Sequence, residues 1–149
     1  MFKNILFVCV GNICRSPVAE YWARDQLIKK GFSGIQVASA GIHAMQSESI
    51  APEMQIILNQ FQIDASKHSA KQIDKNDVAH AEIIFTMETW QKEKLAFAFP
   101  SSRGKIFNLG KWSNEEIVDP YRKEQAIFEN VFESIKKNWG LWQTKLWNG

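Results

Sequence analysis

Residues 7–17, FVCVGNICRSP, contain both cysteines of this 149-residue chain within one short segment. Cys9 and Arg15 are the outer members of a Cys-x5-Arg pattern, and Ser16 follows directly. A loop of this length can curl so that thiol and guanidinium face the same bound group. A guanidinium binds two oxygens of an oxyanion in a planar fork, and a thiolate is a strong nucleophile. The segment therefore predicts a cysteine nucleophile that faces a phosphate-like anion.

The backbone of this segment is suited to anion binding. Ser16 is a good helix N-cap and Pro17 fits the first helical position, so a helix is predicted to begin here. The amides of the loop then converge on the positive end of that helix. Gly11 permits unusual backbone angles, and Asn12 tolerates left-handed geometry. The loop amides and the helix end together favour the thiolate form of Cys9, and the Ser16 hydroxyl can bond to its sulfur.

Other interpretations of the segment are open at this stage. A cysteine at the end of a buried strand is commonly a small core residue. Two cysteines can bind a metal, but Cys9 and Cys14 have no second ligand pair, and the histidines lack the helical spacing of a zinc site. A nucleotide-binding loop is the third interpretation, although neither GxxxxGKS/T nor GxGxxG is present. We therefore expect no metal here.

The elements that would position this segment alternate between strand and helix. Short apolar runs predict buried strands at 4–8, 35–39, 82–87 and 105–109. Helical spacing of apolar residues predicts helices across 17–31, 50–61, 89–99 and 128–146. This alternation predicts one α/β domain over residues 1–149, with a parallel sheet and helices on both faces. Ligand sites in such folds lie at the carboxyl ends of the strands, where FVCVGNICRSP is predicted to lie.

Composition excludes several classes of protein. Hydrophobic residues make up 45% of the chain, which is enough for a real core. The 18 basic and 16 acidic residues are mixed along the chain without a dense basic stripe, so no nucleic-acid partner is expected. The first apolar run is too short for a signal peptide, and no stretch approaches the ~20 apolar residues that span a bilayer. We expect a cytoplasmic protein with reduced cysteines and no membrane insertion.

The stretch VCVGNICRSP resembles the signature loop of the low-molecular-weight protein tyrosine phosphatases. Similarity extends to ASAGI at 38–42, SKHSAKQI at 66–73, IIFTME at 83–88 and VDPYRK at 118–123. The resemblance implies a four-stranded parallel sheet, a phosphate-binding loop between the first strand and the first helix, and no metal or organic cofactor. It also implies that phosphotyrosine is hydrolysed to inorganic phosphate through a cysteinyl-phosphate. The implied substrate-binding residues of the loop are Val10, Gly11, Asn12, Ile13, Cys14 and Ser16.

Asp119, in the segment EEIVDPY, is the distant partner that the resemblance supplies. By itself an Asp-Pro pair most often marks a turn. A tyrosine leaving group has an ordinary pKa of about 10, however, so its departure is costly without a proton donor. The resemblance implies that Cys9 attacks phosphorus, that Asp119 first protonates the phenol and then activates water, and that Arg15 holds the phosphate oxygens. The expected pH–rate profile is a bell with an acidic optimum.

Further matches to the family support the loop or face the substrate. Ser39 and His68 match polar residues that form a hydrogen-bond network with Asn12 beneath the loop. Tyr121 matches the aromatic wall on which the substrate ring packs. Met45 lies near a position that many members fill with an aromatic residue, so a flexible thioether is expected to line the pocket instead.

Cys14 matches the second cysteine of the loop. Because it neighbours a reactive thiolate, a reversible disulfide with Cys9 that protects against over-oxidation is a hypothesis. The predicted test is detection of this bond after mild peroxide treatment.

The pair Met87-Glu88, where the family commonly has Met-Asp, and the short loop GKWSNEEIVDPYRK are similar to a bacterial subgroup often called Wzb-like. Its members are paired with membrane tyrosine kinases of capsule or exopolysaccharide export, which implies a phosphotyrosine cluster on the cytoplasmic tail of such a kinase as substrate. An arsenate reductase of the same fold is one alternative, but beyond Cys14 the chain has no resolving cysteine. A non-catalytic phosphate-binding module is another, which would not need both Cys9 and Asp119.

Overall fold

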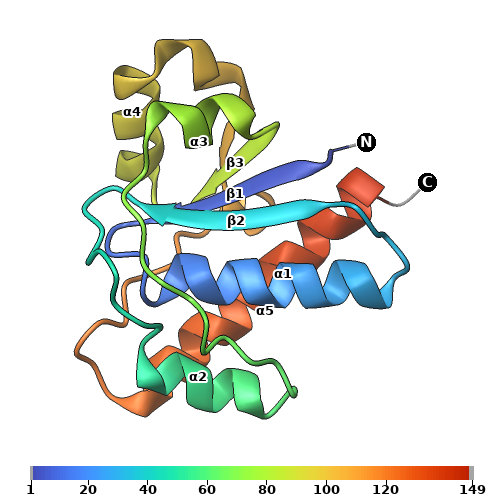
Figure 1. Cartoon of the computed structure of the whole chain (residues 1–149), viewed down its shortest axis with the longest axis vertical. Coiled ribbons are helices and arrows are strands. Elements are labelled where there is room, and N and C mark those ends of the chain that lie inside the picture. The colour runs from blue at the N-terminus through green and yellow to red at the C-terminus, as the bar shows by residue number, and fades with distance from the viewer. Residues whose placement is uncertain (1, 148–149) are drawn as a thin grey trace.

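Strands and helices alternate along the chain, as the apolar runs predict. The computed structural model describes residues 2–147. Figure 1 shows the elements, which are β1 (Asn4–Cys9), α1 (Arg15–Lys29), β2 (Gln36–Gly41), α2 (Pro52–Asn59), α3 (Lys75–His80), β3 (Ile83–Thr86), α4 (Thr89–Ala98), η1 (Pro100–Lys105), β4 (Ile106–Asn108), η2 (Leu109–Ser113) and α5 (Gln125–Trp147).

The four strands form one parallel sheet in the order β2-β1-β3-β4. Every residue of β3, and every residue of β1 after Asn4, is buried, because helices cover both faces. This two-sided cover explains why these strands are continuous apolar runs rather than alternating ones. In the register of the sheet Cys9 pairs with Gly41, and Val8 pairs with Thr86. The carboxyl ends of the central strands therefore meet at one edge, as the sequence predicts.

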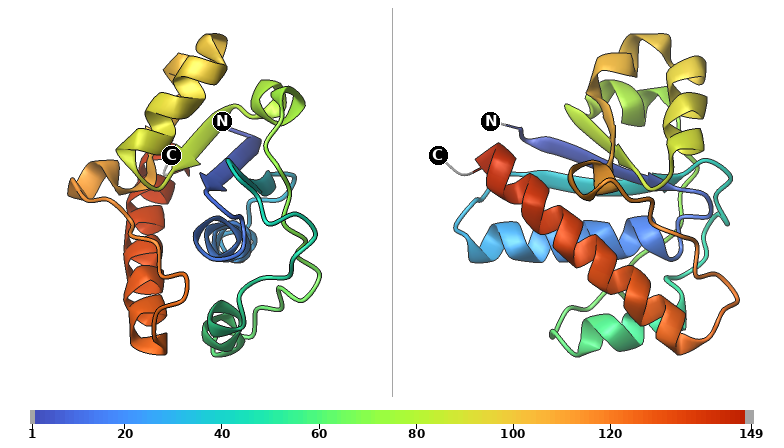
Figure 2. Two further views of the ribbon diagram at one scale, coloured as in Figure 1. Left: turned by 90° about the vertical axis from the view of Figure 1, so that its left-hand side faces the viewer. Right: turned by 180° about the vertical axis from the view of Figure 1, so that it is seen from behind.

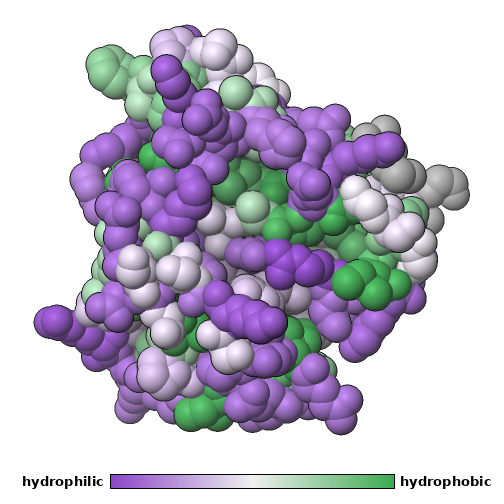
Figure 3. All heavy atoms as spheres, viewed as in Figure 1, coloured by the Kyte–Doolittle hydropathy of each residue, from purple (hydrophilic) through white to green (hydrophobic). Residues whose placement is uncertain are grey.

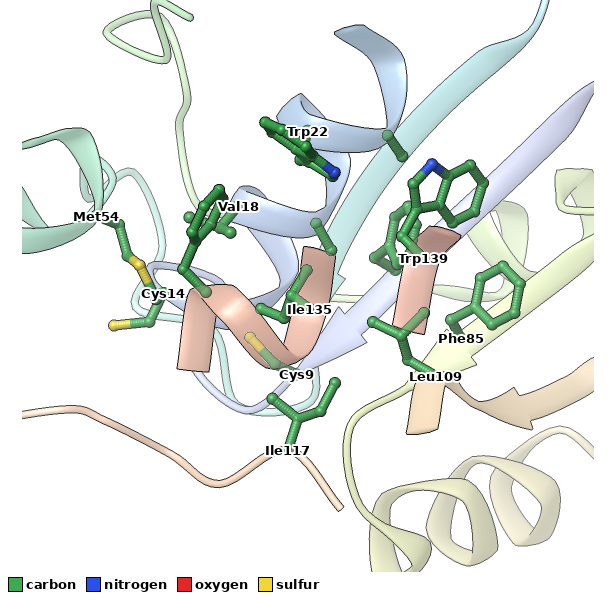
Figure 4. Packing of buried hydrophobic residues seen from close by; sticks show 14 of the residues in the cluster. Cys9, Cys14, Val18, Trp22, Met54, Phe85, Leu109, Ile117, Ile135 and Trp139 are labelled. Atoms are coloured by element: carbon green, nitrogen blue, oxygen red, sulfur yellow. The ribbon is translucent and has the colours of Figure 1, made fainter. Parts of the chain in front are cut away.

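The helices divide between the two faces of the sheet. Helices α1, α2 and α5 pack on one face, and α3 and α4 pack on the other (Figures 1 and 2). Alternate residues of β1 serve the two cores: Phe7 faces α5, whereas Leu6 and Val8 face α3 and α4. The larger core is rich in aromatic rings; the Phe85 and Trp142 ring centroids are 4.8 Å apart. Figure 4 shows this core between the sheet and α5.

The bounds of several elements differ from the prediction, and one helix was not predicted. Helix α1 begins at Arg15 with Cys14 as its N-cap, so Ser16 lies inside the helix rather than capping it. The helix predicted across 50–61 is shorter, since α2 covers only Pro52–Asn59. The strand predicted at 105–109 keeps only Ile106–Asn108. Helix α3 was not predicted, because six residues are too few to show helical periodicity. Its start is fixed by a capping box in which Asp74 and Asp77 each accept a hydrogen bond from the other's backbone N–H. Within residues 2–147, no helix has the length and apolar character needed to cross a bilayer.

Candidate active site

A pocket of about 140 Å³ opens at the carboxyl end of β1. Its walls come from the loop between β1 and α1, from the segment after β2, and from the segment that precedes α5. The lining residues are Cys9, Val10, Gly11, Ile13, Cys14, Arg15, His43, Met45, Asp119 and Tyr121. The pocket therefore brings together the predicted nucleophile, the predicted anion-binding arginine and the distant aspartate.

A larger groove, of about 600 Å³, lies at the amino ends of β1 and β2 beside α3. Figure 3 shows hydrophobic side chains gathered in a hollow on this face, with hydrophilic side chains around them. Asn4, Gln36 and His80 line the groove, but none of its lining residues is a cysteine or an arginine. Because the reactive groups lie in the smaller pocket, that pocket is the candidate active site.

Cys9 is the last residue of β1 and is only 2% exposed. Its sulfur is hydrogen-bonded to the Ser16 hydroxyl at 2.9 Å, and the Ser16 backbone N–H donates to it at 3.4 Å. The Ser16 oxygen accepts a hydrogen bond from Asn12 Nδ2 at 2.8 Å, so its own proton is free to point at the sulfur. The Ser16 hydroxyl and backbone N–H therefore both lie against the Cys9 sulfur.

Asn12 holds the loop from beneath. Its backbone φ is 60°, which is the left-handed region that asparagine tolerates. Its Nδ2 donates to Ser39 Oγ at 2.9 Å, and its Oδ1 accepts from the backbone N–H of Lys71 at 2.9 Å. His68 Nε2 donates to the carbonyl oxygen of Asn12 at 2.7 Å. The structure therefore joins the predicted residues Asn12, Ser39 and His68 in one buried hydrogen-bond network.

This network continues into α1 through residues that sequence reasoning missed. The Ser39 hydroxyl donates to Glu20 Oε1 at 2.6 Å. Glu20 is paired with Arg24, which also donates to the carbonyl oxygen of Val37. The ring of Tyr21 packs edge-on against His68, with centroids 6.3 Å apart. The i,i+4 spacing of Glu20 and Arg24 is visible in the sequence, but only the fold shows that this pair braces β2 beneath the loop.

Arg15 is charged yet only 1% exposed. Its Nη1 donates to Glu88 Oε2 at 2.7 Å and to the carbonyl oxygen of Ile117 at 2.8 Å. Its Nη2 lies 3.8 Å from Asp119 Oδ2. Within residues 2–147, Arg15 donates hydrogen bonds to protein groups only through Nη1. The rest of the guanidinium is therefore available to an anion in the pocket.

Glu88, the partner of Arg15, is a further residue that sequence reasoning did not assign to the site. It is the N-cap of α4, and Gln91 fixes it: Gln91 Oε1 accepts from the backbone N–H of Glu88 at 3.1 Å, and Gln91 Nε2 donates to Glu88 Oε2 at 3.3 Å. Gln91 is fully buried. The spacing of Glu88 and Gln91 directly after a strand is a capping-box pattern that locates the helix start, and this is the signal that points to them.

The base of the segment that carries Asp119 is anchored to α5. The Glu115 carboxylate accepts hydrogen bonds from Ser134 Oγ at 2.6 Å and Asn138 Nδ2 at 2.8 Å, and Lys137 Nζ lies 3.1 Å from it. These contacts, that of Ser134 first, lower the pKa of Glu115 to about 2. A Cβ on Gly110 would lie 2.0 Å from the Glu115 carbonyl oxygen, so this close approach requires glycine.

Asp119 itself is on an exposed turn. Its side chain is 47% exposed, and its Oδ1 accepts a hydrogen bond from the backbone N–H of Tyr121 at 3.0 Å. This is an Asx turn around Pro120, which explains why the Asp-Pro pair reads as a turn in the sequence. Tyr121, 38% exposed, and Asp119 both line the pocket. One local turn therefore presents an acid and an aromatic ring to the same space.

The two cysteines differ in environment although both are buried and free. Burial raises the pKa of the Cys14 thiol well above its usual range, and the nearby charges of Cys9 and Asp119 raise it further. Cys14 therefore stays a protonated thiol at neutral pH, and the disulfide with Cys9 stays a prediction.

Met45 and His43 complete the rim on the side of β2. The backbone N–H of Met45 donates to the carbonyl oxygen of Gly11 at 3.0 Å. The thioether lies over the loop, since a Cβ on Gly11 would be 3.6 Å from the Met45 sulfur. His43 Nε2 accepts from Lys94 Nζ at 3.4 Å, and its place in the lining was not predicted. Among residues 2–147, no group of three or more His, Cys, Asp and Glu side chains is arranged to hold a metal ion.

The chain is similar over nearly its whole length to known proteins. Residues 4–148 match the family model of the low molecular weight phosphotyrosine protein phosphatases. The chain is 35% identical to a probable phosphatase of this kind, EpsP of Ralstonia nicotianae, over 98% of this chain and 97% of the relative. It is 37% identical to Wzb of Escherichia coli K12, again over 98% and 97%. The crystal structure of the Erwinia amylovora tyrosine phosphatase AmsI superposes with a TM-score of 0.91 at 32% identity, over 99% of this chain and 95% of that one.

Proposed function

Because the chain belongs to the low molecular weight phosphotyrosine protein phosphatase family, we propose that Cys9, Arg15 and Asp119 carry out its protein-tyrosine phosphatase reaction. One observation carries this assignment. Cys9 and Asp119, which are far apart in the sequence, line one pocket, and the Arg15 guanidinium lies 3.8 Å from the Asp119 carboxylate. Phosphate-ester cleavage by a cysteine requires three groups: a nucleophile, a cationic hydrogen-bond donor to the phosphate oxygens, and a proton donor for the leaving group.

The first step transfers the phosphoryl group to the enzyme. The Cys9 thiolate attacks phosphorus, so a sulfur–phosphorus bond forms while the bond from phosphorus to the tyrosyl oxygen breaks. The electron pair of the broken bond goes to the phenol oxygen, and the protonated Asp119 carboxyl gives it a proton. The Ser16 hydroxyl and backbone N–H support this role because they lie against the sulfur that attacks and later leaves, where hydrogen bonds can stabilise negative charge.

The second step releases phosphate. The Asp119 carboxylate takes a proton from water, and the water oxygen attacks the phosphorus of the cysteinyl-phosphate. The sulfur–phosphorus bond breaks and returns the thiolate, so one phosphotyrosine and one water give one tyrosine and one inorganic phosphate. The 47% exposure of the Asp119 side chain supports this step, because water can reach the acid from outside the pocket.

Arg15 and the loop amides hold the phosphate oxygens in both steps. Glu88 acts on the substrate only through Arg15, so we propose it as a positioning residue. Glu88 and the Ile117 carbonyl accept hydrogen bonds from Nη1 and so fix one edge of the Arg15 guanidinium. The other edge is then already oriented toward the phosphate site before substrate binds. Such preorganisation lowers the reorganisation needed when negative charge develops in the transition state.

The proposed substrate is a phosphorylated tyrosine cluster on the cytoplasmic tail of a membrane tyrosine kinase of capsule or exopolysaccharide export, so the enzyme would act in the cytoplasm. The similarity to Wzb and EpsP supports this subgroup. The pocket supports an aromatic substrate, because Tyr121 and Met45 flank the opening above Cys9. A phosphotyrosine ring is long enough to place its phosphate at the floor, whereas a phosphoserine side chain is shorter.

The test measures phosphate release from matched phosphotyrosine and phosphoserine peptides by wild type and Cys9→Ser, with a metal chelator present throughout. We expect release from the phosphotyrosine peptide only, unaffected by the chelator. Cys9→Ser is expected to lose at least about 10⁴-fold in kcat while it still unfolds cooperatively and binds phosphate. Binding of phosphate by wild type without any release would overturn the catalytic assignment and favour a phosphate-binding module. Arsenate-dependent oxidation of thiols would favour the reductase.

A further inference from the structure

A second cleft, of about 420 Å³, adjoins the catalytic pocket. The two share the side chains of Ile13, Met45 and Tyr121 as a common wall. The cleft continues from that wall toward the first turn of α2 and is lined there by Glu48, Ser49, Ile50, Ala51, Pro52, Glu53, Arg122 and Phe128. Because the wall is shared, a chain whose phosphotyrosine occupies the pocket must pass over this cleft or over the opposite rim.

The cleft is fixed to the phosphate-binding loop through the backbone. The N–H of Ala51 donates to the carbonyl oxygen of Ile13 at 2.8 Å, and the N–H of Glu48 donates to the carbonyl oxygen of Met45 at 3.0 Å. On the far side, Gln125 Nε2 donates to the carbonyl oxygen of Glu53 at 3.0 Å. Backbone hydrogen bonds therefore tie the cleft to the loop that carries Cys9.

Two carboxylates line this cleft without a protein partner. Among the ion pairs and side-chain hydrogen bonds of residues 2–147, none involves the carboxylate of Glu48 or of Glu53. Arg122 also lines the cleft, but its guanidinium carbon lies 5.2 Å from the centroid of the Tyr121 ring rather than on a carboxylate. The charge of Glu53 is felt at the catalytic pocket, since it is among the groups that raise the pKa of Cys14.

The opposite rim of the pocket carries the other sign of charge. His43 lines the pocket there, and the Lys94 ammonium lies 3.4 Å from its ring. The mouth of the site is therefore polarised, with free carboxylates toward α2 and an ammonium toward α4. A substrate strand that crosses the mouth meets a different sign of charge on each side of its phosphotyrosine.

We propose that this cleft binds a lysine or arginine side chain of the substrate, one to three residues from the phosphotyrosine, and so determines peptide specificity. The proposal rests on the phosphatase function proposed above. Consecutive residues of an extended peptide are about 3.3–3.6 Å apart, so a long cationic side chain at that separation spans from the shared wall into the cleft. Its methylene stem packs on the buried side chains Ile50 and Phe128, and its charged head reaches Glu48 and Glu53.

The test compares three phosphotyrosine peptides of equal length in which the neighbouring residues are arginine, glutamine or glutamate. The measured quantity is the ratio of kcat/KM for the arginine peptide to kcat/KM for the glutamate peptide, because any change common to all substrates cancels in it. We expect a ratio of about 5 to 10 for wild type at low ionic strength, and a smaller one at high salt. The double variant Glu48→Gln/Glu53→Gln is expected to bring the ratio close to one.

Glu93→Gln is the matched control. It makes the same change of charge on an exposed residue of α4 that lines neither the pocket nor the cleft, so its ratio should equal that of wild type. A wild-type ratio near one, or an equal change in Glu93→Gln, overturns the proposal. A ratio below one also overturns it and assigns the cleft to an acidic residue bound by Arg122.

Binding measurements with Cys9→Ser separate this proposal from the catalytic one. The dissociation constants of the three peptides are expected to keep the order arginine, glutamine, glutamate, from tightest to weakest. If wild type hydrolyses none of the peptides but Cys9→Ser keeps this order, the catalytic assignment fails and the cleft proposal stands. If wild type hydrolyses all three and no order is found in binding or in kcat/KM, only the cleft proposal fails.

Discussion

Two of the walls of the candidate pocket differ in burial and in hydrogen bonding. On the wall formed by the phosphate-binding loop, residues 9–16, the side chains of Asn12, Arg15 and Ser16 are each at most 1% exposed. Asn12 donates a hydrogen bond to Ser16, and Arg15 donates one to Glu88. On the wall formed by the acid turn, residues 119–123, the side chain of Asp119 is 47% exposed and that of Tyr121 is 38% exposed. One wall is part of the core, and the other is a surface turn.

This difference matches the two tasks of a phosphatase. Charge on the phosphate oxygens is best stabilised by donors that are already in place, because no free energy is then spent on reorganisation in the transition state. Proton transfer at the leaving group instead requires the acid to approach each new phenol oxygen and later a water. Under the proposed mechanism, the rigid wall therefore holds the groups that bind the phosphate oxygens, and the exposed turn holds Asp119, the proposed proton donor.

Substitution of Asn12 is expected to have the largest effect on the rigid wall. Asn12→Ala removes three side-chain hydrogen bonds and puts alanine at a φ of 60°, so the free energy of unfolding should fall by about 3 kcal/mol. We expect kcat/KM to fall at least about tenfold with it, because Ser16 loses its partner. Urea unfolding and initial rates measure both.

The matched change on the other wall is Tyr121→Ala, which should alter the free energy of unfolding by less than about 0.5 kcal/mol. Asn12→Gly loses the same hydrogen bonds without left-handed strain and should fall between Asn12→Ala and wild type. Equal losses of stability for Asn12→Ala and Tyr121→Ala would remove the contrast between the two walls.

A smaller effect is expected at Glu115, where the acid turn joins the rigid part of the domain. The folded-state pKa of Glu115 is about 2 and its ordinary value is 4.5, so its ionised form stabilises the fold above the ordinary value and this gain is lost as pH falls toward 2. Glu115→Gln should lower the free energy of unfolding by about 1 kcal/mol at neutral pH.

The difference between Glu115→Gln and wild type should shrink below about pH 4.5, as protonation removes the same charge from wild type. Urea titrations of both proteins at neutral pH and at about pH 3 measure this. If the difference in free energy of unfolding does not change with pH, the charge of Glu115 does not stabilise the fold. The acid turn would then not be anchored through this carboxylate.

The smallest effect is a difference in the rate of alkylation between Cys14 and Cys9. The raised pKa of Cys14 keeps it a thiol at neutral pH, whereas Cys9 is the proposed nucleophile and its sulfur is hydrogen-bonded to Ser16. Brief treatment with iodoacetamide should therefore alkylate Cys9 and leave Cys14 unmodified, as seen by mass spectrometry of the peptides. Pre-incubation with phosphate should protect Cys9. Equal labelling of the two would show that the rigid wall does not distinguish them.

The sequence predicts the rigid wall better than the exposed one. Cys9, Asn12, Arg15 and Ser16 lie in one short segment, so their spacing alone indicates an anion-binding turn at the end of a strand. Asp119 has no local signature beyond Asp-Pro, and only the family resemblance connects it with Cys9. Distance along the chain, rather than burial, therefore limits what spacing can predict.

The site residues that the sequence did not predict also lie far along the chain from the groups they contact. Glu20 and Glu88 are bound to the site through Ser39 and Arg15, which are remote in sequence, so their roles appear only when the sheet brings β2 and α4 beside the loop. Glu48 and Glu53 are ordinary charged residues in the sequence. They become candidates for specificity only because the fold places their cleft next to Cys9.

The measurement that tests the two-wall account most directly is the dependence of kcat/KM on the leaving group, compared between wild type and Asp119→Asn over a series of aryl phosphates from nitrophenyl to phenyl. Asp119→Asn keeps the side chain's shape but cannot donate the proton. We expect wild type to depend weakly on the leaving group, and Asp119→Asn to lose about 10²- to 10⁴-fold on phenyl phosphate but far less on nitrophenyl phosphate. Parallel slopes for the two proteins would contradict the account, because proton donation would then not come from the exposed turn.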